Sequence, residues 1–331
     1  MTVCVHGVGH VGLAAAALFA NNGHEVVGYD PDEELVEALR DGDPPTTEPE
    51  FRTYVRDAIE AGFTPSHDPE TADYHVVCVP TPYDERAGAA DLTYVRQASR
   101  TVADLLRPGD AVVLESTVPP GTTEEVLGSA VSAADLQPGA DVSLAYCPET
   151  VLPGNVAHEL VHNDRIVGGV DTASTERVVD LFEPCIEGAI RRAPDPTTAE
   201  FVKLAQNAYR DVNIAFANEL ARVAHDYGVH SRTAIAFANA HPRVDVLDPG
   251  PGVGGHCLPV DPHFLGQASD ETDLVDTARA INDRMPDHVL DLLAAELDTL
   301  RGKTVAVLGV AYKGNVADTR NSPGLAIGRE L

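Results

Sequence analysis

The sequence predicts an α/β protein with an N-terminal doubly wound parallel sheet and an all-α middle domain. Three observations carry this prediction. Short apolar segments alternate with helical segments over the first 190 residues. A long helical period then runs from residue 197 to 227, and a strand-like segment returns at Thr304. Alternation of this kind is typical of parallel sheets covered by helices, whereas an unbroken 3.6-residue period indicates a helical domain.

The first elements are a strand over 2–6, a glycine turn, a helix over 13–21 and a strand over 25–29 that ends at Asp30. Gly7 permits a tight turn, Gly9 lets a pyrophosphate approach the backbone, and Gly12 lets helix and strand pack closely. An acid at Asp30 can bind ribose hydroxyls, and because no arginine follows it closely, NAD is favoured over NADP. A glycine turn that binds no phosphate is the alternative. The predicted dinucleotide site comprises Gly7, Gly9, His10, Val11, Gly12 and Asp30.

Three further strands are predicted over 74–79, 111–115 and 142–146, with another over 165–170. Each of the first three ends at a polar or proline-containing segment: Pro80-Thr81-Pro82, Ser116 to Gly121, and Cys147-Pro148-Glu149. Because ligands bind outside the carboxyl ends of parallel strands, these segments should line one crevice. Helices are expected over 31–40, 92–106 and 122–134.

The long helix of the middle domain has apolar residues at helical spacing and should join two domains and form an oligomer seam. We therefore expect a homodimer or a higher homo-oligomer. Further helices are expected over 231–240 and 271–299, and a strand over 304–309 would open another α/β domain that the sequence does not finish. The expected division is 1–190, 191–300 and 301–331. The helical period comprises Phe201, Leu204, Ala205, Ala208, Val212, Ala215, Phe216, Glu219 and Leu220.

Composition excludes several classes of protein. Among 331 residues, 52 Asp and Glu face 23 Lys and Arg, a formal net charge of −29, which disfavours nucleic-acid binding. No apolar run approaches the roughly 18 residues of a membrane span, and no basic leader begins the chain. Five cysteines without a CxxC pair fit a reducing cytoplasm. An acidic surface with three lysines indicates a halophilic source, with an ordinary arginine-biased acidic protein as the alternative.

Cys257 is the candidate nucleophile. It lies in a glycine- and proline-dense loop over 249–262, beside His256 and four residues before Asp261. Exposed N–H groups and an imidazole can favour the reactive thiolate. A buried apolar cysteine is one alternative. A metal site of His256, Cys257 and His263 is another, but it lacks a second clustered pair of ligands, so no metal is predicted.

Lys203, Asn207 and Arg210 lie at i, i+4 and i+7 of the long helix and therefore share a face. A lysine kept in a chain with three lysines suggests a half-buried cation that stabilises an oxyanion or alkoxide. A solvated row of polar side chains is the alternative.

These segments carry a resemblance to a family that covers the chain from end to end. The sequence resembles the nucleotide-sugar 6-dehydrogenases, and most closely the members that act on UDP-N-acetyl-D-mannosamine. The matching segments are Gly7 to Gly12, Val79 to Pro82, Ser116 to Val118, Pro148-Glu149 with Leu152 to Asn155, Asn163 to Gly169, Glu200 to Lys203 through Leu220, His241 to Arg243, Gly252 to Pro262, Gly309 to Lys313 and Asp318 to Arg320.

The resemblance implies a four-electron oxidation that makes a uronate for polysaccharide biosynthesis. The sugar C6 alcohol gives a hydride to NAD, Cys257 adds to the aldehyde, a second NAD takes a hydride, and water hydrolyses the thioester. By motif position, Lys203 with Asn207 would stabilise the alkoxide or act as acid and base, and Asp261, Glu149 and Thr117 would position base and water. Thr81, Thr117 and Arg320 would bind the cofactor. The substrate would contact Thr150, Val151, Lys203, Asn207, Arg210, His241, Arg243, Gly254, Tyr312 and Lys313, with Arg243 reaching across a dimer.

Two departures from the family pattern affect these expectations. The family usually has arginine after Pro148-Glu149, where this chain has Thr150, so the particular sugar is less securely implied. The family also carries a third, UDP-binding domain, of which residues 301–331 would be only the start. A truncated, inactive NAD-binding remnant or a split-gene subunit is therefore the alternative function. A two-electron β-hydroxyacid dehydrogenase is a further alternative, but it needs no cysteine.

Overall fold

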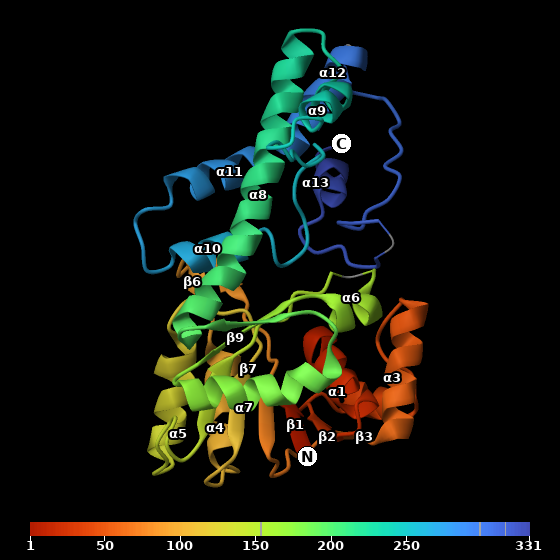
Figure 1. Ribbon diagram of the computed structural model, residues 1–331. Helices are drawn as coiled ribbons and strands as arrows, with labels where there is room; N and C mark the ends of the chain where they lie inside the picture. The colour runs from red at the N-terminus through yellow and green to blue at the C-terminus, as the bar shows by residue number, and fades with distance from the viewer. Residues whose placement is uncertain (153, 298, 315) are drawn as a thin grey trace. The chain divides into compact units, whose positions relative to one another are not determined.

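The computed structural model describes residues 1–331 except 153, 298 and 315. The chain divides into two compact units, Met1–Lys203 and Leu204–Leu331, which we call the N-terminal and C-terminal units. The boundary falls within the long helix α8 (Pro196–Asp226). Figure 1 shows the chain coloured from one end to the other, and each unit is described separately below.

The N-terminal unit is built on one eight-stranded sheet. Its order is β10-β9-β8-β7-β4-β1-β2-β3, so the chain reverses direction across the sheet between β1 and β4. All neighbouring pairs are parallel except β8 and β9, which are antiparallel. The strands are β1 (Thr2–His6), β2 (Glu25–Tyr29), β3 (Phe63–Ser66), β4 (Tyr74–Val77), β7 (Ala111–Leu114), β8 (Ser143–Tyr146), β9 (Arg165–Gly169) and β10 (Ile190–Ala193), with a hairpin of β5 (Tyr83–Asp84) and β6 (Ala89–Ala90).

Both faces of this sheet are buried, because alternate residues of its strands join different apolar clusters. Val113 of β7 belongs to one cluster, whereas Val112 and Leu114 belong to the other. Period-two alternation explains this split. The first cluster includes side chains of α1 (His10–Asn21), α3 (Pro49–Ala61), α6 (Val156–His162) and α7 (Thr172–Phe182). The second includes those of α4 (Thr93–Ala103), the π-helical turn η1 (Thr123–Gly128) and α5 (Ser129–Ala133), while α2 (Glu33–Arg40) lies beside β3.

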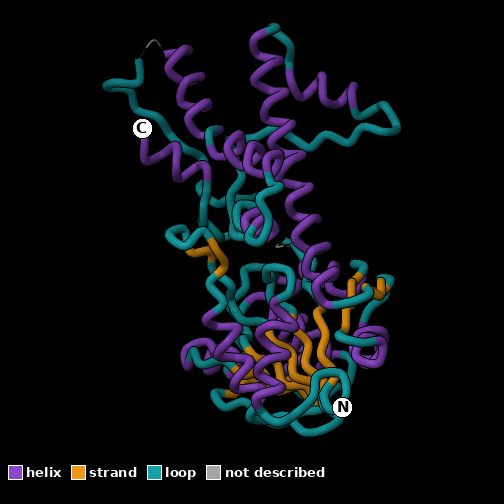
Figure 2. Tube along the Cα trace, turned by 90° about the vertical axis from the view of Figure 1, so that its left-hand side faces the viewer, coloured by secondary structure: helices purple, strands orange, loops and turns teal. Residues whose placement is uncertain are grey.

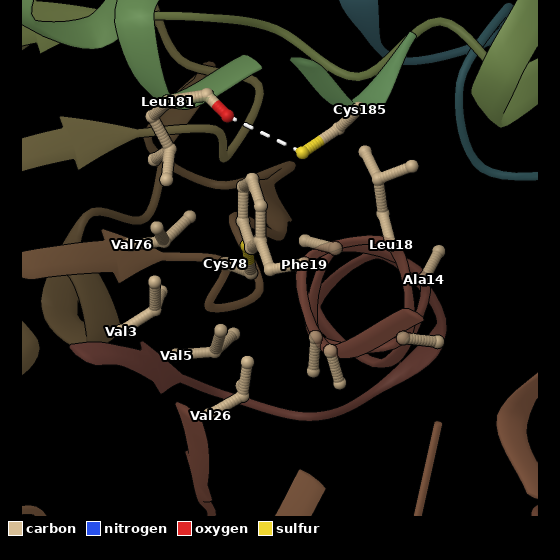
Figure 3. Packing of buried hydrophobic residues seen from close by; sticks show 14 of the residues in the cluster. Val3, Val5, Ala14, Leu18, Phe19, Val26, Val76, Cys78, Leu181 and Cys185 are labelled. Carbon is tan, nitrogen blue, oxygen red and sulfur yellow. Dashed lines mark hydrogen bonds between the residues drawn. The ribbon is translucent and has the colours of Figure 1, made fainter. Parts of the chain in front are cut away.

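Phe19 of α1 lies within the first cluster (Figure 3). The surrounding side chains come from β1, β2 and β4, and from Leu181 and Cys185 near the end of α7. The Cys185 thiol donates a hydrogen bond to the Leu181 carbonyl oxygen at 3.3 Å within the short helix η2 (Glu183–Cys185) and the end of α7. Phe19 also meets Phe182 edge to face, with ring centroids 5.2 Å apart. Packing of this kind makes α1 and its preceding glycine turn a fixed part of the sheet.

The predicted α/β class with a doubly wound N-terminal sheet is confirmed. The strands expected over 2–6, 25–29, 74–79, 111–115, 142–146 and 165–170 all form, some of them one or two residues shorter. The helix expected over 122–134 begins as a π-helical turn before α5. Sequence analysis did not specify α3, β3, α6, α7 or β10, although α3 has apolar residues at helical spacing.

The C-terminal unit contains helices, and all strands among the described residues belong to the other unit (Figure 2). Its small apolar cluster joins Ala217 of α8 with Ile235 and Val246. A buried polar network also ties α8 to α11, since Arg279 pairs with Asp211 and Asn282 donates to Asp211. The helices are α9 (Ser231–Ala238), α10 (Asp261–Gly266), α11 (Asp273–Asp283), α12 (Met285–Leu297) and α13 (Pro323–Glu330), after the C-terminal part of α8.

Two predictions for this unit are wrong in detail. The segment Thr304–Gly309 is not a strand; it is largely exposed, and Leu308 retains 94% of its surface. A parallel strand needs neighbours for its backbone groups, and none pairs with this segment among the described residues. The helix expected over 271–299 is two helices, α11 and α12, with Pro286 in the first turn of α12. Proline removes an N–H donor and is favoured at such a start.

The helix expected over 197–227 is confirmed as α8. In the described part of the chain, none of the helices combines the length and the apolar character required to cross a bilayer.

Candidate active site

The loop between β1 and α1 has the geometry of a phosphate-binding turn. Gly7 has φ +89°, which favours glycine, and an added Cβ at Gly12 would lie 1.8 Å from the Gly7 carbonyl oxygen. In the described structure, an added Cβ at Gly9 would meet no atom within 4 Å. Gly9 therefore leaves open the approach to the N-terminus of α1, where His10 and Val11 begin the helix. The positive end of the helix dipole fits a pyrophosphate there.

Asp30 is held against this turn by two backbone groups. Its Oδ2 accepts a hydrogen bond from the Val8 N–H at 2.9 Å, and its Oδ1 accepts one from the Asp32 N–H at 3.0 Å. The carboxylate thus lies beside the glycine turn at the carboxyl end of β2, where a ribose would follow a bound pyrophosphate. These groups fit a dinucleotide.

Hydrogen bonds join the loop after β4 to the loop after β7. In the sheet, β4 lies between β7 and β1, the strand that precedes the glycine turn. The buried Thr81 hydroxyl donates to the Thr117 carbonyl oxygen at 2.6 Å. The Ser116 hydroxyl donates to the Val79 carbonyl oxygen at 2.7 Å. Because β1 and β4 flank the point where the sheet reverses, Thr81 and Thr117 lie where ligands collect in doubly wound sheets.

Glu149 and Lys203 meet in the N-terminal unit. The Lys203 Nζ donates a hydrogen bond to the Glu149 carbonyl oxygen at 2.8 Å. The Glu149 carboxylate accepts from the backbone N–H groups of Thr150 at 2.6 Å and Val151 at 3.0 Å, both through Oε1. Thr150 and Val151 are half-buried. Lys203 is also half-buried, as expected for a cation kept for a specific role.

A buried guanidinium lies behind Glu149. Arg165 Nη2 donates to Glu149 Oε2 at 2.9 Å, and Arg165 Nη1 lies 3.6 Å from Glu115 Oε1. Burial raises the pKa of Glu115 to about 7, although the nearby Arg165 opposes this shift. Burial would lower the pKa of Arg165, but Glu149 and the other anionic groups raise it above its ordinary value. Arg165 therefore stays charged.

A second buried carboxylate links the start of α8 to the loop that follows Thr117. Glu200 accepts hydrogen bonds from the Gly121 N–H at 2.5 Å, and from the Thr123 N–H and hydroxyl at 2.8 and 2.6 Å. Burial raises its pKa to about 7. Glu200 precedes Lys203 by one helical turn, so it fixes the helix from which that lysine extends.

In the C-terminal unit, the Cys257 loop is joined to α8 through Asp261. The buried Asp261 accepts from Asn207 Nδ2 at 2.5 Å, and its N–H donates to the Cys257 carbonyl oxygen at 2.9 Å as α10 begins. Cys257 itself is exposed, whereas Cys4, Cys78, Cys147 and Cys185 are buried. The buried-cysteine alternative for Cys257 is therefore wrong.

Tyr312, Arg320 and Asn321 pack on the same loop. The Gly255 N–H donates to the Arg320 carbonyl oxygen at 2.9 Å, and Asn321 Nδ2 donates to the Gly255 carbonyl oxygen at 2.9 Å. An added Cβ at Gly254 would lie 2.7 Å from Tyr312 Cβ. Glycine is therefore required where Tyr312 covers the loop.

Arg320 is a charged neighbour of Cys257. The hydrogen bonds that Arg320 donates to the Asp318 carboxylate are the main cause that raises the pKa of Arg320, and attraction to Cys257 adds to it. Burial and then the positive charge of Arg320 lower the pKa of His256. At neutral pH His256 is therefore an uncharged imidazole, and Arg320 supplies the positive charge.

The remaining predicted substrate residues lie in separate places. Arg210 is half-buried on α8, and Lys313 is exposed beside Tyr312. His241 and Arg243 lie in an exposed turn after α9, where the Arg243 N–H donates to His241 Nδ1 at 3.3 Å.

Ligand-type side chains cluster elsewhere, in the sheet. Among the described residues, Cys4, His6 and His75 form a group whose possible ligand atoms lie within 4.8 Å, whereas His256, Cys257 and His263 do not. His6 Nε2 and His75 Nδ1 lie 3.0 Å apart. Burial lowers the pKa of His6 to about 3 and that of His75 to about 4, and raises that of Cys4 to about 11. All three groups are therefore neutral, and their hydrogen bonding serves the packing of β1 on β4.

Sequence analysis missed the residues that support the site. Two of these residues, Arg165 and Glu200, lie in segments that match the family pattern, and Glu115 ends a predicted strand. Nothing in their spacing shows that they are buried. A charged residue within an apolar strand, as at Arg165, was the available signal.

Comparisons with known proteins agree with this geometry. Residues 1–186 match the model of the UDP-glucose/GDP-mannose dehydrogenase family, NAD binding domain, and residues 197–284 match that family's central domain. A UDP-N-acetyl-D-mannosamine dehydrogenase of Methanocaldococcus jannaschii is 43% identical over 97% of this chain and 74% of its own length. An NDP-N-acetyl-D-galactosaminuronic acid dehydrogenase of Ralstonia nicotianae is 42% identical over 98% of this chain and 79% of its own length.

Solved structures give the same result. The UDP-D-ManNAc dehydrogenase of Pyrococcus horikoshii has a TM-score of 0.94 at 40% identity, covering 100% of this chain and 80% of that one. The cofactor is therefore NAD, and the chain is an oxidoreductase of the nucleotide-sugar dehydrogenase type. On the matched domains, the glycine turn with Asp30 and the Cys257 loop, the chain belongs to the UDP-glucose/GDP-mannose dehydrogenase family.

Proposed function

We propose that this protein oxidises the C6 hydroxymethyl group of a UDP-sugar, UDP-N-acetyl-D-mannosamine, to the uronate through a covalent intermediate on Cys257. The observation that carries the proposal is the exposed Cys257 in a loop fixed by Asp261 and Asn207, with Arg320 as its cationic neighbour. The choice of sugar rests on the substrates in the names of several relatives.

The proposed reaction balances as two oxidations and a hydrolysis. NAD⁺, when bound, accepts one hydride in each oxidation. The alcohol first loses a hydride and a proton to give the aldehyde, and the Cys257 thiolate adds to its carbonyl carbon while the oxygen takes up a proton. Loss of a second hydride and a proton leaves a thioester, whose C–S bond water breaks to release the carboxylate and the thiol.

Residues of the chain have distinct roles in this scheme. Lys203, with Asn207, stabilises the oxyanion that develops at C6 or transfers its proton. Asp261 orients Asn207 and begins α10 next to Cys257. Thr117, Glu149, Thr150 and Val151 form the surroundings of the reacting carbon on the N-terminal unit. Arg210, His241, Arg243, Gly254, Tyr312 and Lys313 bind the nucleotide sugar, and Arg320 also reaches the cofactor.

We further propose that the active form is a homodimer or a higher homo-oligomer formed through α8. Several large apolar side chains of this helix are exposed, among them Tyr209, which keeps 63% of its surface; Tyr227, which directly follows the helix, keeps 81%. Spacings of seven and eight residues put most of them on one face, which is typical of a helix that packs against another protein surface. The exposed set is Phe201, Tyr209, Phe216, Val223 and Tyr227.

The environment also belongs to the proposal. A net charge of −29 on a chain with three lysines fits a cytoplasm rich in salt, where charge repulsion is screened. Assays are therefore best run in molar potassium chloride.

NADH release from a panel of nucleotide sugars tests the function. UDP-N-acetyl-D-mannosamine should yield two NADH per sugar, together with the uronate detected by mass spectrometry. A yield that stops at one NADH would favour a two-electron dehydrogenase. NAD binding with no turnover of any UDP- or GDP-sugar would favour a protein that only binds NAD.

A further inference from the structure

Glu149 holds its carboxylate away from solvent. Its side chain is 5% exposed, and three donors occupy the carboxylate: the N–H groups of Thr150 and Val151, and Arg165 Nη2. The atom of Glu149 that meets Lys203 is instead the backbone carbonyl oxygen, at 2.8 Å. The side chain thus serves to fix the peptide that receives the ammonium.

Arg165 donates to the Glu149 carboxylate from a buried position. Water therefore cannot take its place as a donor. Arg165 lies on β9 with 2% of its side chain exposed, 4.9 Å above the Phe182 ring. On its other side it faces Glu115, whose side chain is fully buried after β7. Of the two carboxylates, the one of Glu149 accepts a hydrogen bond from Arg165, whereas Glu115 Oε1 and Arg165 Nη1 lie 3.6 Å apart without one. Removal of the guanidinium would leave both buried carboxylates without their cation, which is strongly destabilising.

We propose that Arg165 is a positioning residue that, with the Glu149 carboxylate, holds the Glu149 carbonyl oxygen against Lys203, and that Glu115 competes for the same guanidinium when it is ionised. This inference rests on the proposed function for its catalytic consequence, because Lys203 is the group proposed to stabilise the C6 oxyanion. Glu149 then acts on the reaction through its backbone and not as a general base.

Ionisation of Glu115 changes how Arg165 is shared. When Glu115 is protonated, Arg165 pairs with Glu149 alone; when Glu115 is ionised, the guanidinium is divided between two carboxylates. The other titratable groups that face this cluster are Cys78, which donates to Glu115 Oε2 at 3.2 Å, Cys147, Cys185 and Tyr54. Burial raises the pKa of each, so all four are neutral near pH 7. The titrating member is Glu115, with a pKa raised to about 7 by its burial.

Modification of Lys203 tests the positioning without any assay of turnover. The chain has three lysines, so Lys303, which is exposed, is an internal reference for reductive methylation followed by mass spectrometry. Arg165→Lys and Glu149→Gln should each raise the methylation rate of Lys203 severalfold relative to Lys303, because the ammonium loses its fixed acceptor. Arg191→Lys is the matched control: Arg191 lies on the neighbouring strand β10 in an exposed pair with Asp164. It should leave the ratio unchanged.

Kinetics then test the catalytic consequence. Arg165→Lys should lower kcat by about 10²-fold, the scale of a small misplacement of a catalytic group, with NAD affinity and KM within about twofold of the unaltered protein. The double variant with Glu149→Gln should be no slower than the slower single variant, because both changes release the same carbonyl. Glu115→Gln should retain activity above pH 7 where the unaltered protein loses it.

Three results would overturn the proposal. One is an unchanged Lys203 methylation ratio in folded Arg165→Lys, as judged by normal NAD binding. Another is a loss of kcat in Glu149→Gln alone, with Arg165→Lys active, since this would make the carboxylate a general base. If Arg165→Lys does not fold, two results together would refute the proposal. These are an unchanged Lys203 methylation ratio in Glu149→Gln, and a pH profile of Glu115→Gln that equals that of the unaltered protein. Failure of the unaltered protein to oxidise any nucleotide sugar would refute the proposed function but not the methylation result.

Discussion

The two units of this protein both contain buried ion pairs but differ in how much apolar packing surrounds them. The N-terminal unit buries both faces of a parallel sheet under helices, and its core is a pair of large apolar clusters. The C-terminal unit has a small apolar cluster around Ala217 and Ile235, and depends on a buried network that joins Asp211, Arg279 and Asn282. Apolar packing tolerates small changes in geometry, whereas a buried ion pair fails when one partner is removed.

This difference matches the division of chemistry between the units. The N-terminal unit contains the glycine turn after β1 and, on the first part of α8, Lys203, whereas the exposed Cys257 and Asp261 belong to the C-terminal unit. Changes to the glycine turn should therefore affect cofactor binding, whereas a change at Cys257 should affect the covalent step alone.

Cys257→Ala should abolish uronate formation and leave NAD binding intact. The proposed second oxidation needs the thiohemiacetal, and removal of a covalent nucleophile costs about 10⁴-fold or more. The measurement is conversion of the C6-aldehyde sugar to uronate, together with NAD affinity by fluorescence titration. Cys185→Ala, which removes a buried cysteine of the N-terminal core, is the control and should retain conversion. Uronate formation at the normal rate in Cys257→Ala would refute the covalent mechanism.

Arg279→Met should destabilise the C-terminal unit by about 3–5 kcal/mol, because it leaves the fully buried Asp211 without its cation. Hydrogen exchange of α8 and α11 peptides measures this change, while NAD affinity reports on the other unit. Arg284→Met, in which an exposed arginine of the same region is replaced, should have an effect below about 0.5 kcal/mol. Equal exchange in both variants would show that the network does not support this unit.

Leu18→Ala should destabilise the N-terminal unit by about 2–5 kcal/mol, the usual range for a buried leucine. The loss should appear in denaturant unfolding followed by NAD release, with exchange in the C-terminal unit less affected. Tyr94→Ala, at a side chain that keeps 48% of its surface, is the control and should be near neutral. If Leu18→Ala accelerates exchange equally in both units, the two units unfold together and the distinction drawn above is wrong.

The sequence predicts the two units unequally well, for the same physical reason. Strands of a buried parallel sheet are continuous apolar runs, so β1, β2, β4, β7, β8 and β9 are recognisable from local pattern alone. The Gly7 and Gly12 roles follow from a spacing that leaves no room for a Cβ. Sequence analysis also recognised Lys203 and Cys257 as candidate site residues.

The local sequence pattern does not predict which residue a buried polar group will pair with. Arg165 meets Glu149 and Glu115 only because β7, β8 and β9 are neighbours, and the antiparallel direction of β9 has no signal in its residues. The strand expected over 304–309 shows the converse. Its apolar residues have strand character, but a strand forms only where a neighbour supplies hydrogen bonds, and no neighbour pairs with it among the described residues.

The pH dependence of stability in the N-terminal unit should depend in part on Glu200. Burial raises its pKa from 4.5 to about 7 in the folded protein, so between these values the folded state binds more protons than the unfolded state. Stability therefore falls as pH rises through this window, by at most about 1.4 kcal/mol per pH unit for this group. Glu200→Gln should change stability by no more than about 1 kcal/mol at pH 5, where the acid is neutral.

Above pH 7 the variant should be the more stable protein, since its amide does not ionise. Urea unfolding at pH 5, 6, 7 and 8 in constant molar salt measures the divergence. Glu176→Gln is the control. The exposed Glu176 carboxyl pairs with Arg192, which lowers its pKa, so this variant should not gain stability as pH rises. If stability changes with pH in the same way for Glu200→Gln and the unaltered protein, this prediction is wrong. The three donors of Gly121 and Thr123 would then stabilise the carboxylate enough to offset its burial, and the loop after Thr117 would be held equally well at every pH.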